Sequence, residues 1–105
     1  MSDSPVYVIA NLVIDDSDRY REYEKGFFPL LKRHDGKLIT FDDNTIELEK
    51  GDKNLSGRFV LFSFPSAEKA RQWYEDPDYQ SLSEHRRAST KTQFLRLIHG
   101  IPLRK

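Results

Sequence analysis

Two segments of the chain are apolar on both faces when they are drawn as β-strands. In Val6–Ile14 and in Arg58–Phe64, apolar side chains occupy both the odd and the even positions, so neither strand has a face suited to water. A strand of this kind must be buried on both sides. We therefore expect both segments to lie in one sheet that is covered on its two faces by different elements.

The segment after Val6–Ile14 is predicted to be a helix. Asp16 and its neighbours can cap its start, and Asp35-Gly36 is a typical helix end. Pro29 removes one backbone hydrogen bond from the interior of this segment, which predicts a kink or break near Gly26. Its inward face is formed by residues at helical spacing: Tyr20, Tyr23, Phe27, Leu30, Leu31 and His34.

A pair of helices is predicted after Arg58–Phe64. Ser66 can cap the first of them, and Asp76-Pro77 stops it and starts the second. The inward positions of the pair are apolar, aromatic or basic: Ala67, Ala70, Trp73 and Tyr74 in the first, and Tyr79, Leu82 and Arg86 in the second. The final strand is predicted over Thr92–His99.

Between the first helix and Arg58–Phe64, the turn-prone residues 42–44 separate Lys37–Phe41 from Thr45–Glu49, which predicts a short hairpin or a bulged bend. The resulting βαββαβ order predicts the α+β class, as a ferredoxin-like sandwich with an antiparallel sheet and helices on one face. The other sheet face still needs cover. A second copy of the same sheet requires only one self-complementary patch, so we expect a homodimer packed through this sheet face, a dimeric α+β barrel.

Composition narrows the function classes. The 105 residues carry no cysteine and equal numbers of basic and acidic side chains, 17 of each. This excludes disulfides, a thiolate nucleophile and cysteine-held zinc or iron–sulfur groups, and it argues against nonspecific nucleic-acid binding. We expect one domain over 1–105 with frayed tails at 1–4 and 102–105, a cytoplasmic location, and neither a signal peptide nor a membrane span.

One run of residues resembles a known family. The run is Phe64-Pro65-Ser66, Glu68, Ala70, Trp73-Tyr74, Pro77, Tyr79-Gln80 and Arg86, and further matches are Tyr7, Tyr20, Tyr23 and His34-Asp35-Gly36. They are similar to the domain of unknown function 1330 family, over nearly the whole chain. That family usually has two glycines after this histidine, whereas Asp35 takes the first place here. The resemblance implies a dimeric α+β barrel, an architecture shared with small monooxygenases, muconolactone isomerases and haem-binding chlorite dismutases, and it implies no particular reaction.

Two residues stand out as candidates for chemistry. Arg86 lies on an inward helix face, where its guanidinium can hold a carboxylate or phosphate through two hydrogen bonds, or simply meet the carbonyls at the helix end. His34 ends the first helix, where it can cap the terminal carbonyls or act as a general base at the mouth of a pocket between helices and sheet.

The remaining candidates are aromatic or polar residues near these two. Trp73, Tyr79 and Tyr23 can wall a ligand pocket or form ordinary core, and Asn11 and Ser63 are polar positions within apolar strands that need a partner or a ligand. The three histidines have no ligand spacing, so we expect no metal site and no cofactor. Two hypotheses remain: a dimer that binds, and can act on, a small and perhaps anionic organic molecule, or a dimer with a purely structural or non-catalytic binding role.

Overall fold

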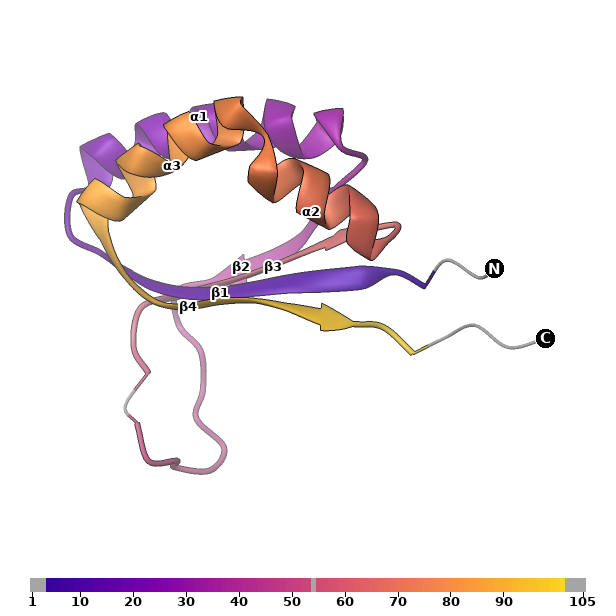
Figure 1. Ribbon diagram of the computed structural model, residues 1–105. Coiled ribbons are helices and arrows are strands. Elements are labelled where there is room, and N and C mark those ends of the chain that lie inside the picture. Colours follow the sequence, from indigo (N-terminus) through magenta and orange to yellow (C-terminus); the bar gives the residue numbers. More distant parts are fainter. Residues whose placement is uncertain (1–3, 54, 102–105) are drawn as a thin grey trace.

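Three helices cover one face of a four-stranded antiparallel sheet (Figure 1). The structure is a computed structural model that describes residues 4–53 and 55–101, so the expected frayed tails, apart from Ser4, lie outside the described residues. The strand order is β2-β3-β1-β4, which confirms the predicted ferredoxin-like α+β fold. Along the chain the elements are β1 (Val6–Ile14), α1 (Ser17–Arg33), β2 (Lys37–Asp42), β3 (Arg58–Phe64), α2 (Ala67–Glu75), α3 (Pro77–Ser89) and β4 (Thr90–His99).

The predicted helix starts are confirmed by their capping hydrogen bonds. The side chains of Asp16 and Ser66 each accept a hydrogen bond from the backbone amide three residues further on. Asp76 closes α2 and also caps α3, where it accepts a bond from the amide of Asp78. These contacts satisfy amides that have no partner within a helix.

The break predicted near Gly26 is wrong, because α1 runs without interruption from Ser17 to Arg33. Gly26 instead allows α1 and α3 to approach each other. A Cβ atom at Gly26 would lie 2.6 Å from the Cδ1 atom of Leu82 in α3, closer than real contacts allow. Pro29 is exposed, so the carbonyl that loses its helical partner lies in a turn near solvent.

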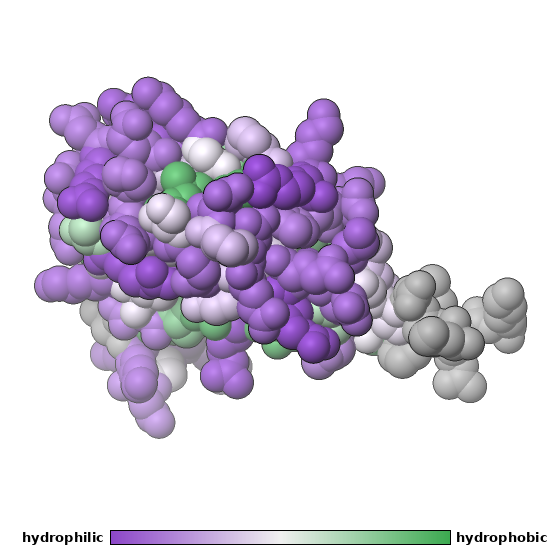
Figure 2. Space-filling model, turned by 45° about the horizontal axis from the view of Figure 1, so that its top comes forward, coloured by the Kyte–Doolittle hydropathy of each residue, from purple (hydrophilic) through white to green (hydrophobic). Residues whose placement is uncertain are grey.

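The core lies between the helices and the sheet. It contains the alternate residues of β1 that face the helices, including Val6, Val8 and Leu12, together with the inward aromatic residues of the helices and of β3. The outer surface of the helices is largely hydrophilic (Figure 2). Among the described residues, no helix is long and apolar enough to cross a membrane.

The prediction of a second strand in the hairpin after β2 is wrong. Thr45–Glu49 forms no strand, and its apolar residues Ile46 and Leu48 are 83% and 93% exposed. β2 pairs with β3 and lies at the edge of the sheet. Its outer side has no partner strand among the described residues, and a five-residue segment with two glutamates would gain little burial there. The connection between β2 and β3 projects away from the helices, beyond the uncovered face of the sheet (Figure 1).

We call this uncovered face the open face. Its side chains come from the positions that alternate with the core, and several are only half-buried although they are apolar: Tyr7, Ile9, Phe59, Leu61 and Phe94. Ile98 of β4 is 48% exposed on the same face. The chain therefore leaves an apolar sheet surface without cover of its own, as the two-faced strands predicted.

Candidate functional site

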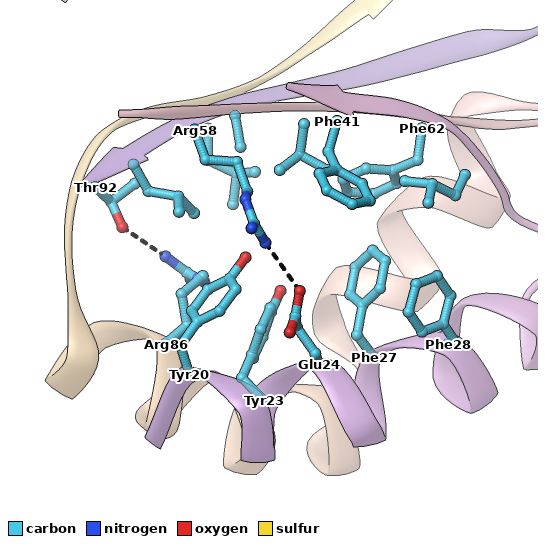
Figure 3. A pocket seen from close by; sticks show the side chains of 15 residues that line it. Tyr20, Tyr23, Glu24, Phe27, Phe28, Phe41, Arg58, Phe62, Arg86 and Thr92 are labelled. Atoms are coloured by element: carbon cyan, nitrogen blue, oxygen red, sulfur yellow. Dashed lines mark hydrogen bonds and ion pairs between the residues drawn. The ribbon is translucent and has the colours of Figure 1, made fainter. Parts of the chain in front are cut away.

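A small cavity of about 50 Å³ lies between the sheet and the helices (Figure 3). All four strands contribute to its lining, together with α1 and α3. Among the described residues that line it, there is no histidine, and the one carboxylate is that of Glu24.

Arg86 of α3 is the most buried charge in the lining. It is only 6% exposed, and its Nη1 atom donates a hydrogen bond of 2.9 Å to the Thr92 hydroxyl. Its Nε atom is buried and has no hydrogen-bond partner among the described residues. Within the same part of the chain, no carboxylate pairs with this guanidinium, which therefore lines the cavity as a positive charge without a counter-charge.

Two tyrosines of α1 place their hydroxyl groups near this charge. Tyr23 lines the cavity, and its hydroxyl lies 2.7 Å from that of the fully buried Tyr79. Burial raises the pKa of Tyr23 well above its usual value, and the Tyr79 hydroxyl adds to the effect. Burial also raises the pKa of Tyr20, although Arg58 opposes it. Both hydroxyls therefore stay protonated at neutral pH. The Tyr20 hydroxyl can donate a hydrogen bond into the cavity, whereas the Tyr23 hydroxyl shares a hydrogen bond with Tyr79 in which either can be the donor.

Arg58, the first residue of β3, is held by two carboxylates. Its Nε and Nη2 atoms donate to Asp43 at 2.8 and 3.1 Å, and its Nη1 atom donates to Glu24 at 2.9 Å. These hydrogen bonds lower the pKa of Asp43 and raise that of Arg58. The guanidinium also lies 4.7 Å from the ring centroid of Phe41. The positive charge of Arg58 is therefore neutralised by carboxylates, whereas that of Arg86 is not.

The opposite end of the cavity is aromatic. Phe27 packs edge-on against Phe62 with ring centroids 5.2 Å apart, and Phe28 and Phe41 lie near them (Figure 3). Phe28 and Phe41 are 50% and 49% exposed, so the cavity meets solvent on this side, although Thr92 at the other end is exposed as well. We call this side the mouth.

Two β-bulges give the cavity part of its lining. The pairing of β2 with β3 skips Ile39, so Leu38 and Phe41, three residues apart, both line the cavity. The pairing of β4 with β1 likewise skips Gln93, which places both Thr92 and Leu95 in the lining. In a regular strand, residues three apart point to opposite faces.

His34 does not line the cavity. It caps the C-terminal end of α1, and its Nε2 atom donates to the Asp76 carboxylate at 2.8 Å. Arg33 donates to the same carboxylate at 3.0 Å. His34 thus joins α1 to the junction of α2 and α3, and a role for it in chemistry stays a prediction.

Trp73 and Tyr79 form the core beneath the cavity rather than its wall. Their ring centroids lie 4.2 Å apart, and Trp73 also packs against Phe62 and Phe64. Neither residue lines the cavity. Tyr79 reaches it indirectly, by holding the hydroxyl of Tyr23.

Asn11 and Ser63 lie on the open face, away from the cavity. The Asn11 amide donates to the backbone carbonyls of Ser56 and Arg58 at 2.9 and 3.2 Å, so it fastens the end of the β2–β3 connection to the sheet. Ser63 is half-buried opposite Tyr7 and Lys37. Of the residues proposed from sequence, the structure brings Arg86 and Tyr23 together at the cavity.

Sequence reasoning missed several residues of the site, among them Tyr20, Glu24, Arg58 and Thr92. A signal was available for Arg58, because it shares its strand parity with the core residues Val60 and Phe62. No such signal existed for Thr92, whose direction depends on the bulge. Among the described residues, no group of three or more potential ligands could hold a metal ion.

The sequence profile of a domain of unknown function, DUF1330, matches residues 5–101. The chain belongs to this family. No curated protein matches this DUF1330 chain. Asp35, at the position where the resemblance implies glycine, has a φ angle of 64°, a left-handed conformation that favours glycine.

Solved structures share the fold of this DUF1330 domain. A protein of unknown function from Rhodopseudomonas palustris has a TM-score of 0.75 at 18% identity, covering 98% of this chain and 85% of its own. SnoaB, a cofactor-independent oxygenase from Streptomyces nogalater, has a TM-score of 0.63 at 12% identity over 93% and 94% of the two chains. A dimeric ferredoxin-like protein of unknown function from Thermobifida fusca has a TM-score of 0.59 at 13% identity over 96% and 92%. At these identities the comparison establishes the fold alone.

Proposed function

We propose that this DUF1330 protein binds a small organic anion in the cavity between sheet and helices, with Arg86 as the anchor. The observation that carries the proposal is the burial of this guanidinium with a neutral partner, Thr92, and no carboxylate among the described residues. A buried charge without a partner destabilises a protein by several kcal/mol. A bound anion would supply the missing counter-charge.

The neighbouring groups support an anion rather than a cation. The protonated hydroxyl of Tyr20 is a donor, and the one lining carboxylate, Glu24, is occupied by Arg58. The described lining offers no free general base. If the ligand reacts here, the cavity is therefore suited to stabilising negative charge on it rather than to removing a proton from it.

We also propose that the protein is a homodimer that packs through the open face. The support is the row of half-buried apolar side chains on that face, together with a structural neighbour described as dimeric. A two-fold contact needs only one patch that matches itself. The expected cytoplasmic location stays a prediction, which fractionation of the source cells would test.

The anion proposal is tested by thermal shift. The purified protein is screened against small carboxylates, phosphates, flavins and haem, because a ligand that binds only the folded state raises the melting temperature. We expect shifts with small anions that are lost in Arg86→Gln and kept in Arg87→Gln, a control that changes an exposed arginine on the same helix. Shifts that persist in Arg86→Gln would contradict Arg86 as the anchor, and the absence of any shift across the panel would contradict the anion site and favour the non-catalytic structural dimer.

A further inference from the structure

The lining of the cavity changes in character from one end to the other. Arg86, Thr92 and Tyr20 lie together at one end (Figure 3). Phe27, Phe28, Phe41 and Phe62 gather at the other end, toward the mouth. A ligand that fills this space therefore meets hydrogen-bond donors at its head and aromatic rings along its body.

The charges are also unequal along the cavity. Arg86 stands without a counter-charge at the polar end, whereas Arg58, halfway to the mouth, faces both Glu24 and Asp43. The cluster of Arg58, Glu24 and Asp43 therefore has one negative charge more than it has positive charges. A second negative charge on the ligand, placed toward the mouth, would lie near the Glu24 carboxylate in the lining and be repelled.

We infer that the ligand is a small monocarboxylate with an uncharged, apolar body. Its carboxylate lies at Arg86, and its body lies between the phenylalanines toward the mouth. The inference rests on the proposed function, which it narrows to one class of anion. A carboxylate is favoured because Arg86 lines the cavity and the planar pair of oxygens of a carboxylate matches a guanidinium.

The aromatic end determines which carboxylates fit. A flat ring of the ligand can pack against the rings of Phe27 and Phe62. Because Phe28 and Phe41 are half-exposed, the body of the ligand can extend beyond the small cavity toward solvent. Inorganic phosphate and acetate have no body for this end, so they gain nothing from it.

The test is calorimetric titration of the protein with four probes: benzoate, its neutral analogue benzyl alcohol, the dianion phthalate, and inorganic phosphate. We expect benzoate to bind about tenfold or more tightly than each of the others, the difference that one charge-assisted hydrogen-bonded pair provides. Arg86→Gln should weaken benzoate by about tenfold or more and leave benzyl alcohol unchanged. Phe41→Ala should also weaken benzoate, and Arg87→Gln should not.

The outcomes separate the inference from the proposed function. Phthalate or phosphate binding as tightly as benzoate, and through Arg86, would overturn the ligand class while the proposed anion site stands. Equal binding of benzoate and benzyl alcohol, unaffected by Arg86→Gln, would overturn both. Absence of binding by all four probes at millimolar concentration would overturn the ligand class, and the thermal-shift screen would then decide on the anion site. Circular dichroism of each variant checks that it is folded.

Discussion

The hydroxyl groups of Tyr23 and Tyr79 lie 2.7 Å apart in the core between α1 and α3, where both side chains are buried. Replacing either residue by phenylalanine leaves the other hydroxyl buried without its partner, which we expect to lower the free energy of unfolding by about 1–3 kcal/mol. The double variant should lose clearly less than the sum of the two, because no orphaned hydroxyl remains.

Urea unfolding of the four proteins in this cycle measures the effect. Tyr74→Phe is the matched control, because Tyr74 is 41% exposed and lies on α2 beside the same aromatic cluster. It should leave stability almost unchanged. Additive losses in the cycle would show that the two hydroxyls do not interact in solution.

The His34–Asp76 contact predicts a dependence of stability on acidity. The hydrogen bond from His34 is the main cause that lowers the pKa of Asp76 from the ordinary 3.8 to about 2. A carboxyl whose pKa is lower in the folded state stabilises the protein above its unfolded pKa, and this contribution is lost as the pH falls toward 2. Asp76→Asn should therefore be less stable than the native protein at pH 7, and the difference should shrink between about pH 4 and pH 2.

Asparagine keeps a side-chain oxygen that can still cap α3, so this comparison isolates the charge from the cap. Asp76→Ala removes both and should cost about 1–2 kcal/mol more. A stability difference between the native protein and Asp76→Asn that does not change with pH would contradict the assignment.

Replacing Asp35 by glycine is expected to stabilise the protein. Asp35 occupies the left-handed position of a Schellman turn, in which Gly36 donates to the Leu31 carbonyl at 2.8 Å and Asp35 donates to that of Lys32 at 3.1 Å. Glycine adopts this conformation without strain, so Asp35→Gly should stabilise the protein by about 0.5–1 kcal/mol in denaturant unfolding.

The substitution also removes the exposed ion pair of Asp35 with Lys69, at 3.3 Å. The Lys69→Ala variant measures the contribution of this ion pair to the free energy of unfolding, and we expect that contribution to be small. A loss of stability in Asp35→Gly greater than that of Lys69→Ala would show that aspartate has a further role in the turn.

If the protein forms the proposed dimer, a charged side chain placed on the open face should separate the two copies and lower the mass in solution to that of one chain. Leu61 is half-buried there and pairs with Ile9 in the sheet register. Sedimentation equilibrium should give twice the 12.4 kDa of one chain for the native protein, and one chain mass for a folded Leu61→Lys variant. Ala88→Lys, on the exposed side of α3, should remain dimeric. A native protein that stays monomeric at all concentrations would contradict the proposed dimer.

Much of the fold could be predicted because its signals are local. The runs of residues apolar on both faces, Val6–Ile14 and Arg58–Phe64, marked the bounds of both strands, and the capping side chains of Asp16, Ser66 and Asp76 marked the helix starts. The prediction at Thr45–Glu49 was wrong although its alternation suits a strand. β2 lies at the edge of the sheet and pairs with β3 on its inner side, and its outer side has no partner strand among the described residues, so alternation alone did not indicate pairing.

The site could be predicted only in part, for a similar reason. Arg86 follows from helical spacing, and Tyr23 from the same spacing in α1. The inward direction of Thr92 follows from a one-residue register shift between β4 and β1, which depends on both strands and leaves no trace in either sequence alone. His34 was expected near a pocket because it ends a helix, but the nearby Asp76 carboxylate holds it elsewhere.

The position of β4 affects how the chain can fold. β1, the strand that needs most burial, pairs with β4 at the far end of the described sequence, with Val6 opposite His99. Contacts between residues so distant along the chain form slowly, because a long loop must close first. During synthesis, β1 gains its second neighbour only after Thr90–His99 has been made. Fragments that end before Thr90 would thus leave one side of β1 unpaired, and this strand, apolar on both faces, would be the kind of sheet edge at which chains aggregate.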